Sequence, residues 1–224
     1  MLLLAIDTSG KNGSIALART DDSGHIEIVD IDPLVGGAFS AQLIPQISEM
    51  LSRHVVNKFN IDALAVTSGP GSFTGLRVGL AAVKALAEVL HKPIAAVSLL
   101  ELCAFVSGAQ GKVMAALDAG RGDVYVGEHE LPATPRSVAR EYLLTASEFL
   151  SHAKGWTVVT HDGGLASSAS ADGLSVTVIP PLTAAGVAHL GWLKIQQGAT
   201  VTPDELEANY IRRTDAEMLE KIRS

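Results

Sequence analysis

The sequence has very little cysteine and few aromatic residues. Cys103 is the single cysteine among 224 residues, so no disulfide bond can form within the chain, as expected in a reducing compartment. Aromatic residues make up 4% of the chain, whereas apolar residues together make up 47% and charged residues 18%. This composition supplies ample material for a buried core, so it predicts a folded globular protein and excludes a disordered one.

Basic residues are also scarce. The chain has 17 Lys and Arg against 24 Asp and Glu, which gives a formal net charge of −7. Affinity for nucleic acids rests largely on Lys and Arg side chains that displace counterions from phosphates. We therefore expect the isolated chain to bind RNA or DNA poorly.

The sequence lacks a long apolar run. Lys84 and Glu101 interrupt the best candidates for the run of about 18 residues that a membrane-spanning helix needs. The apolar stretch in residues 1–10 is too short for a signal-peptide core and contains Asp7. We expect no membrane contact and a cytoplasmic location.

Signals for metal binding and nucleophilic catalysis are missing as well. No two of the seven histidines are four residues apart, and neither an H-E-x-x-H nor a G-x-S-x-G motif occurs. Cys103 lies in an apolar stretch with no neighbouring histidine or basic residue, which indicates a core residue. We expect no catalytic residues, no metal ion and no cofactor.

What is present is a regular alternation of strand and helix patterns. The first half predicts the order βββαβαβα. The expected strands are 2–7, 13–19, 25–31, 61–68 and 94–97, and the expected helices are 40–57, 74–91 and the segment that follows residue 97. In the second half we expect strands at 157–164 and 175–180, a helix after the capping-box pair Thr145 and Glu148, and a long helix at 182–197.

The second half begins like the first. Residues 5–17 align with residues 116–127, which places Asp7 and Asp118 at the ends of two first strands, each followed by a glycine-containing turn and a returning strand. We therefore expect an α/β fold of two similar lobes. The predicted lobes are 1–106 and 107–224, with the tail of the second packing back on the first.

Such hairpins can surround phosphates and magnesium in nucleotide phosphotransferases of the actin and sugar-kinase type. That chemistry needs backbone N–H groups close to anionic oxygens and a carboxylate near hydrated magnesium. The candidate nucleotide-type loops contain Asp7, Thr8, Ser9, Asp118 and Gly120. In the alternative interpretation, these residues simply end two hairpins.

Residues 68–87 (SGPGSFTGLRVGLAAVKALA) are the most distinctive segment. They do not form a Walker loop, because the order G-x-x-x-x-G-K-[ST] is missing. Gly75 and Gly79 fall inside the predicted helix, where each glycine costs about 1 kcal/mol relative to alanine. We therefore expect another part of the structure to approach the helix closely at these glycines.

The same helix has two apolar stripes. One runs through Leu76, Leu80, Val83, Ala87 and Leu90, and the second runs through Val78, Ala82, Ala85 and Val89. A helix on a sheet needs only one such stripe, so the second must be covered by the helix at 40–57 or by another protein chain.

These motifs resemble the TsaB family. The resemblance rests on AIDTSGKNGSIAL at 5–17, SGPGSFTGLRVGLAAVKALA at 68–87, KPIAAVSLLELCA at 92–104 and LDAGRGDVYV at 117–126. It implies a fold of two actin-like (ribonuclease H-like) lobes with mixed central sheets flanked by helices. It also implies a cytoplasmic, non-catalytic relative of the TsaD transferase that pairs with a TsaD-type transferase through helices of its N-terminal lobe. A TsaE-type ATPase joins the pair, and the complex places threonylcarbamoyl on the adenosine beside the anticodon in tRNAs reading codons that begin with A.

The resemblance also implies specific contacts. TsaD-like enzymes carry two metal-binding histidines at the positions of Leu99 and Cys103, and leucine cannot bind a metal. The chemistry is therefore expected on the partner, with tRNA reached only through the complex and a homodimer formed when the partner is absent. The expected partner-binding residues are Leu43, Ile47, Met50, Leu51, Arg77, Val78, Ala82, Ala85 and Val89.

A second class of function stays open. An actin-like ATPase or small-molecule kinase would use Asp7 and Asp118, and ATP turnover by the isolated chain would favour it. A metalloprotease is disfavoured because the histidine pair is lacking.

Overall fold

The computed structural model describes residues 1–21, 23–35, 38–131 and 138–212. It contains two five-stranded sheets of the same topology. In each sheet the first strand pairs antiparallel with the second and parallel with the fourth. The third and fifth strands form the two edges. The predicted pair of similar α/β lobes is therefore confirmed.

The strands of the first sheet come from the first half of the chain. They are β1 (Leu2–Asp7), β2 (Gly13–Thr20), β3 (Ile26–Leu34), β4 (Ala63–Gly69) and β5 (Ile94–Ser98), in the order β3-β2-β1-β4-β5. The second sheet has the order β10-β9-β6-β7-β8. Its strands are β6 (Gly111–Gly120), β7 (Asp123–Leu131), β8 (Val138–Thr145), β9 (Thr157–Thr160) and β10 (Ser175–Val178).

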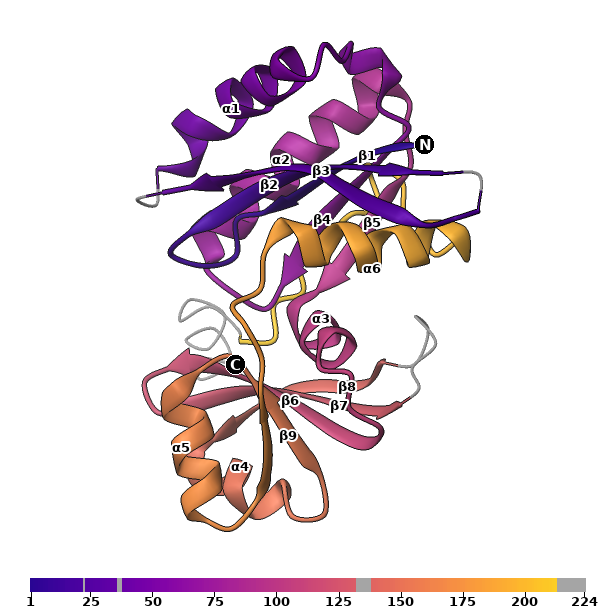
Figure 1. Cartoon of the computed structure of the whole chain (residues 1–224). Helices are drawn as coiled ribbons and strands as arrows, with labels where there is room; N and C mark the ends of the chain where they lie inside the picture. Colours follow the sequence, from indigo (N-terminus) through magenta and orange to yellow (C-terminus); the bar gives the residue numbers. More distant parts are fainter. Residues whose placement is uncertain (22, 36–37, 132–137, 213–224) are drawn as a thin grey trace.

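Helices cover both faces of the sheets. They are α1 (Phe39–Arg53), α2 (Phe73–Leu90), α3 (Leu99–Val106), α4 (Ala146–His152), α5 (Gly163–Ala171) and α6 (Ala184–Gln196), with a short 3-10 helix at Lys58–Asn60. Helices α1 and α2 lie on one face of the first sheet and α6 lies on the other (Figure 1). Within the described residues, no helix is long and apolar enough to cross a bilayer.

Helices α3 and α6 exchange places between the lobes. Helix α3 follows the last strand of the first sheet but packs mainly on β6 and β7, whereas α6 follows the last strand of the second sheet and packs on β1, β2, β4 and β5. Where they meet, the ammonium of Lys194 lies 2.7 Å from the carboxylate of Glu101, and both side chains are largely buried. The predicted lobe boundary at residues 106/107 separates the two sheets along the sequence, while these helices pack across it.

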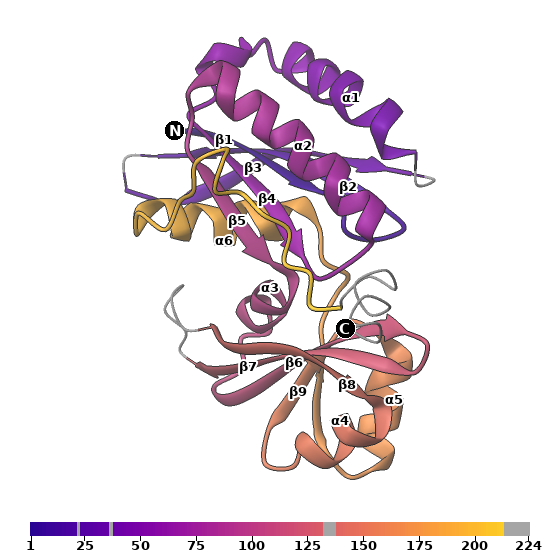
Figure 2. The ribbon, with the colours of Figure 1, turned by 180° about the vertical axis from the view of Figure 1, so that it is seen from behind.

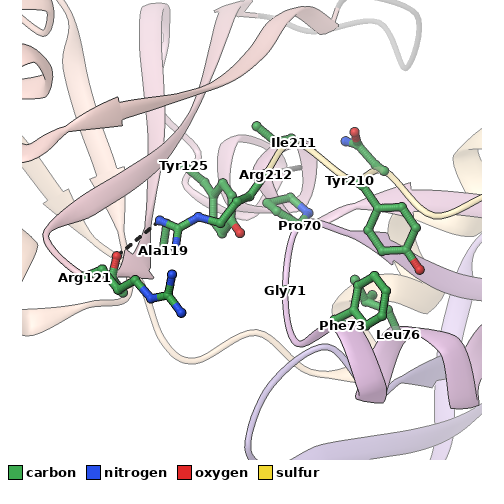
Figure 3. A pocket seen from close by; sticks show the side chains of 12 residues that line it. Pro70, Gly71, Phe73, Leu76, Ala119, Arg121, Tyr125, Tyr210, Ile211 and Arg212 are labelled. Atoms are coloured by element: carbon green, nitrogen blue, oxygen red, sulfur yellow. Dashed lines mark hydrogen bonds between the residues drawn. The ribbon is translucent and has the colours of Figure 1, made fainter. Parts of the chain in front are cut away.

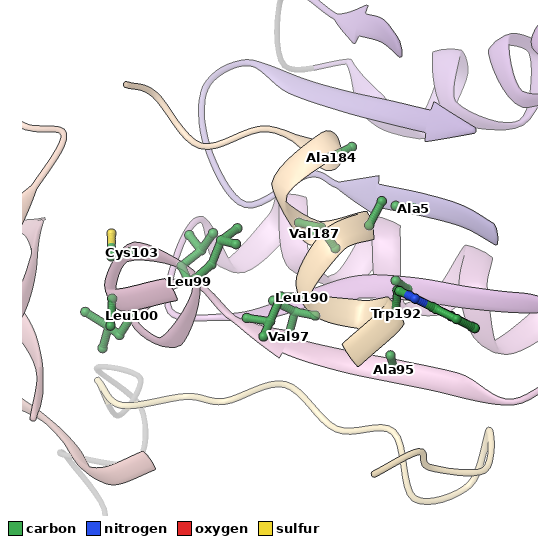
Figure 4. Packing of buried hydrophobic residues seen from close by; sticks show 14 of the residues in the cluster. Ala5, Ala95, Val97, Leu99, Leu100, Cys103, Ala184, Val187, Leu190 and Trp192 are labelled. Atoms are coloured by element: carbon green, nitrogen blue, oxygen red, sulfur yellow. The ribbon is translucent and has the colours of Figure 1, made fainter. Parts of the chain in front are cut away.

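The core between the lobes depends on this exchange. Figure 4 shows Leu99 from α3 on the side of Val187 and Leu190 from α6, and Leu100 and Cys103 on the opposite side of α3. All five side chains are buried in one apolar cluster, together with alanines of the first sheet that let α6 approach closely. The two lobes are therefore joined by a continuous apolar core.

Two local predictions need correction, and two elements, β8 and α5, were not predicted. Helix α1 ends at Arg53, not near residue 57, because Val55 adopts φ 53° and the N–H of Val56 bonds back to the Leu51 carbonyl at 2.8 Å, a Schellman-type end. The strand expected over 157–164 stops at Thr160, since Asp162 caps a helix instead.

Candidate functional site

The first hairpin turn packs tightly against the start of α2. The hydroxyl of Thr8 donates a hydrogen bond to the Gly75 carbonyl oxygen at 2.8 Å. A Cβ atom at Gly75 would overlap the Thr8 carbonyl oxygen, and one at Gly79 would overlap the Thr8 hydroxyl. The expected close approach at these glycines is confirmed, and the approaching group belongs to the chain itself.

The carboxyl of Asp7 is engaged inside its own lobe. Its Oδ1 atom accepts hydrogen bonds from the Ser9 N–H at 3.0 Å, the Ser9 hydroxyl at 2.5 Å and the Thr67 hydroxyl at 3.0 Å. Burial raises the pKa of Asp7 above its ordinary value, although the bonds from Ser9 and Thr67 act in the opposite direction. Asp7, Thr8 and Ser9 are all buried, so these groups stabilise the turn.

The second hairpin repeats this turn in a more exposed setting. Asp118 Oδ1 accepts a hydrogen bond from the Gly120 N–H at 2.8 Å, just as Asp7 accepts from the residue two positions ahead. Gly120 has φ 69°, a left-handed conformation that glycine adopts without strain. The two candidate nucleotide-type loops are thus equivalent hairpin turns, and each carboxyl accepts a hydrogen bond from a residue of its own turn.

A cavity of about 460 Å³ lies between the lobes, beside the β6–β7 turn (Figure 3). Its walls come from the loop before α2, the β6–β7 turn and the C-terminal segment that follows α6. The lining includes the aromatic rings of Phe73, Tyr125 and Tyr210 and the guanidinium groups of Arg121 and Arg212. The residues are Pro70, Gly71, Phe73, Leu76, Ala119, Gly120, Arg121, Tyr125, Asn209, Tyr210, Ile211 and Arg212.

The second stripe of α2 remains open to solvent in the isolated chain. Val89 is 63% exposed and Ala85 is exposed, whereas Val78 and Ala82 are half-buried. The first stripe, by contrast, lies in the core of its own lobe. The chain's own lobes therefore leave part of the second stripe uncovered.

A groove of about 500 Å³ runs between α1 and α2 beside this stripe. Its walls are mostly apolar, and Arg77 is the single charged residue in its lining. The lining residues are Ser40, Leu43, Ile44, Phe73, Thr74, Arg77, Val78, Ala81 and Ala82. We call the groove together with Ala85 and Val89 the docking face.

The contact residues expected on α1 are buried in the isolated chain. Leu43, Ile47, Met50 and Leu51 are between 0% and 7% exposed, because they form the side of α1 that packs on its own lobe. Leu43 also lines the groove and so belongs to the docking face, whereas Ile47, Met50 and Leu51 are buried in the core of the first lobe. The large apolar side chain that α1 exposes is Ile44, at 51%.

The positions at which TsaD-like enzymes are expected to carry histidines are apolar and enclosed in this chain. Leu99 and Cys103 lie on α3 in the core between the lobes. Burial raises the pKa of the Cys103 thiol to about 12. Among the described residues, no cluster of three or more His, Cys, Asp or Glu side chains is arranged to hold a metal ion.

Sequence reasoning missed the C-terminal segment as part of the site. The ring of Tyr210 lies 5.0 Å from that of Phe73, and its hydroxyl accepts a hydrogen bond from Arg77 Nε at 3.1 Å. Arg77 also stacks over Phe73, with its guanidinium carbon 3.6 Å from the ring centre. An aromatic residue within a polar tail is the only local signal for this role.

Comparison with known proteins assigns the family. The family described as TsaD, tRNA N6-adenosine threonylcarbamoyltransferase, matches residues 33–189. The chain belongs to this family. Its expected similarity to TsaB is also confirmed by curated relatives named tRNA threonylcarbamoyladenosine biosynthesis protein TsaB.

The TsaB relative from Bacillus subtilis (strain 168) is 35% identical over 131 residues, which cover 58% of this chain and 56% of that protein. The TsaB relative from Escherichia coli (strain K12) is 31% identical over 134 residues, which cover 58% of this chain and 55% of that protein. The chain thus spans about half the length of the curated relatives it matches. A transferase of the family from Anaeromyxobacter dehalogenans is 47% identical over 111 residues, 44% of this chain and 33% of that protein.

Solved structures support the fold. A Pseudomonas aeruginosa protein described as similar to the peptidase YeaZ superposes with a TM-score of 0.74 over 94% of this chain and 99% of its own, at 24% identity. YeaZ from the same organism gives a TM-score of 0.71 at 24% identity, over 93% of this chain and 99% of that chain. At this identity the likeness bears on architecture alone.

Proposed function

We propose that this chain is a non-catalytic, cytoplasmic scaffold that binds and activates a TsaD-type transferase. Together with a TsaE-type ATPase, the pair would carry out threonylcarbamoylation of the adenosine beside the anticodon in tRNAs reading codons that begin with A. The observation that carries the proposal is the docking face: an apolar stripe on α2, with Val89 63% exposed, beside an apolar groove. Exposed apolar surfaces of this kind mark interaction sites.

The related chains explain the choice of partner. TsaB-named relatives and transferases of the family both match this chain. We therefore expect this chain and a transferase to share this fold in the matched region and to pair through equivalent helices. A stable interface buries roughly 1,200–2,000 Å² in total, which two helices from each partner can supply. Without the transferase, the docking face would pair with the docking face of a second copy of the chain, giving a symmetric homodimer.

The net charge and the first hairpin indicate which protein of the pair binds tRNA and which performs the transfer. A net charge of −7 disfavours independent binding of tRNA, which would reach the complex through the partner. Asp7 is buried and held by Ser9 and Thr67, an arrangement suited to supporting a turn. The transfer chemistry is therefore assigned to the transferase.

A charge placed on the docking face tests the proposal. Ala85→Glu should abolish the complex with the transferase in size-exclusion chromatography with light scattering, because a carboxylate would be buried without a partner. The matched control is Ala171→Glu, an exposed alanine of α5 in the other lobe. Circular dichroism checks that both variants fold. If Ala85→Glu forms the complex as the wild type does, the proposed face is wrong.

A further inference from the structure

The C-terminal segment crosses from the first lobe to the second. It is fixed to the first lobe upstream, where Val201 pairs with Ile94 at the edge of β5 and Leu206 is 1% exposed in the core. From there residues 209–212 descend into the space between the lobes, as the yellow trace in Figure 2 shows. We call residues 209–212 the clasp.

The clasp contacts the first lobe through backbone and ring contacts. The Asn209 N–H donates to the Ser68 carbonyl oxygen at 2.7 Å. A Cβ atom at Gly69 would lie only 2.8 Å from the Asn209 carbonyl oxygen, and Gly69 has φ 127°, so the chain passes closely here because this residue is glycine. Tyr210 then contacts Phe73 and Arg77 on α2.

The other end of the clasp is held by the second lobe. Arg212 forms an ion pair with Asp123 at the start of β7 and donates to the Gly120 carbonyl oxygen at 3.3 Å. The side-chain amide of Asn209 donates to one oxygen of Glu141 on β8, and the other oxygen accepts from Ser98, at the junction of β5 and α3. Four consecutive residues therefore connect both sheets and the helix junction between them.

One group of side chains belongs to both the clasp and the docking face. Phe73 lines the cavity between the lobes and also the groove between α1 and α2, and Arg77 lines the groove. Tyr210 holds both of them, through its ring and its hydroxyl. Arg212 on the second lobe and Tyr210 beside α2 therefore form a continuous physical connection to the surface that a partner would cover.

We propose that the clasp positions Phe73 and Arg77 for the transferase and that docking is thereby coupled to the arrangement of the two lobes. This inference rests on the proposed function for the identity of the partner. Because coupling is reciprocal, binding on α2 must stabilise the clasped arrangement as much as the clasp strengthens binding. Tyr210 and Arg212 are positioning residues, and Arg212 acts without lying on the docking face.

Arg212→Ala is the decisive variant, because it removes the contact with the second lobe and changes no residue of the docking face. Affinity for the transferase, measured by calorimetry, should fall at least about fivefold, the lower end of typical coupling. Arg140→Ala, an exposed arginine of β8, is the matched control and should bind as the wild type does. The charge-exchanged double variant Arg212→Asp with Asp123→Arg should recover most of the lost affinity. An unchanged affinity for Arg212→Ala would overturn the coupling.

The two contacts of Tyr210 can be separated. Tyr210→Phe keeps the ring beside Phe73 and loses the bond from Arg77, whereas Tyr210→Ala loses both. The loss of affinity should therefore be larger for Tyr210→Ala than for Tyr210→Phe. Equal affinity of both variants and the wild type would overturn the role of Tyr210.

Interlobe distances test the clasp independently of the partner. Spin labels at Glu27→Cys on β3 and Ser170→Cys on α5 report the lobe arrangement, since both sites are exposed and Cys103 is enclosed in the core. Arg212→Ala should broaden the distance distribution of the isolated chain, and the transferase should narrow that of the wild type. An identical distribution for wild type and Arg212→Ala would overturn the clasp.

The possible failures are distinguishable. If Ala85→Glu abolishes binding while Arg212→Ala does not weaken it, the docking face stands and the coupling is wrong. If the wild-type chain does not bind the transferase at all, the proposed function fails and the coupling fails with it, and the distance measurement alone then decides whether the clasp holds the lobes together.

Discussion

The hydroxyl of Thr8 donates a hydrogen bond to the carbonyl oxygen of Gly75, and this 2.8 Å contact joins the first hairpin to helix α2. Both groups belong to segments that sequence patterns pick out, but 67 positions separate them along the chain. The contact explains why a helix that forms part of the docking face contains glycines in its interior. It also leads to a direct test of the packing.

Gly75→Ala should destabilise the protein strongly. The added Cβ would overlap the Thr8 carbonyl oxygen, a backbone atom that cannot move without shifting β1. Overpacking of this kind costs about 1–3 kcal/mol or more, and it outweighs the gain in helix propensity of about 1 kcal/mol. Denaturant unfolding measures the difference in the free energy of unfolding.

The control for this prediction is Gly163→Ala at the start of α5, where a Cβ would meet nothing within 4 Å. That variant should be neutral or slightly more stable. Equal losses for the two variants would show that close approach is not the reason for Gly75.

The ion pair between Glu101 and Lys194 should be costly to break. Lys194→Met would leave the Glu101 carboxylate buried without its cation, and within the described part of the chain Glu101 Oε1 already has no hydrogen-bond partner. Breaking a buried pair on one side typically costs about 3–5 kcal/mol. Lys154→Met, at an exposed lysine of the second lobe, should change stability by less than about 0.5 kcal/mol.

The loss should depend on pH. Burial raises the pKa of Glu101, while Lys194 lowers it, so removing the lysine raises it further. A carboxyl with a raised pKa in the folded state contributes stability that is lost as pH rises through that pKa. The cost of Lys194→Met in unfolding experiments should therefore be greater at high pH than at low pH, and the double variant with Glu101→Gln should recover part of it. A pH-independent cost would contradict this reasoning.

His129 should make the protein sensitive to mild acid. The residue lies on β7, is 1% exposed, and burial lowers the pKa of its imidazole to about 4 from an ordinary value of 6.5. At this site the unfolded chain therefore binds a proton below about pH 6.5, whereas the folded chain binds it only near pH 4. The free energy of unfolding falls as pH decreases through that window. The shift corresponds to a loss on the order of 3 kcal/mol.

His129→Leu should abolish this part of the pH dependence. Raised pKa values of Asp7 and Glu141 act in the opposite sense, so the informative quantity is the difference between wild type and variant in the free energy of unfolding between pH 7 and pH 4. His25→Leu, at an exposed position, is the control. Parallel pH profiles for wild type and His129→Leu would refute the prediction.

Local patterns predicted most of the helices and strands, because their causes lie within a few residues. Ser72 Oγ accepts from the Gly75 N–H at the start of α2, and Thr145 with Glu148 forms the expected capping box at the start of α4. Helix α5 was missed because its glycine- and serine-rich sequence has no apolar period. Its one signal was Asp162, which accepts a hydrogen bond from the Leu165 N–H at 2.8 Å.

The site was predicted less completely. The second stripe of α2 was found from helical periodicity, and its exposure at Val89 agrees with the need for cover. On α1, periodicity identified the apolar positions but not whether the first lobe or a partner buries them. The first lobe itself covers Leu43 and its neighbours on that face, and Ile44 is left exposed.

The sequence by itself determined the two similar lobes, the glycine-rich helix with its two stripes, and the family. These features depend on periodicity, turn residues and motifs, which act between near neighbours. Only the tertiary structure decided that α3 and α6 exchange lobes and that Tyr210 meets Arg77, 133 positions away. Such contacts depend on how two already formed sheets pack against each other, and no local preference of the chain specifies that arrangement.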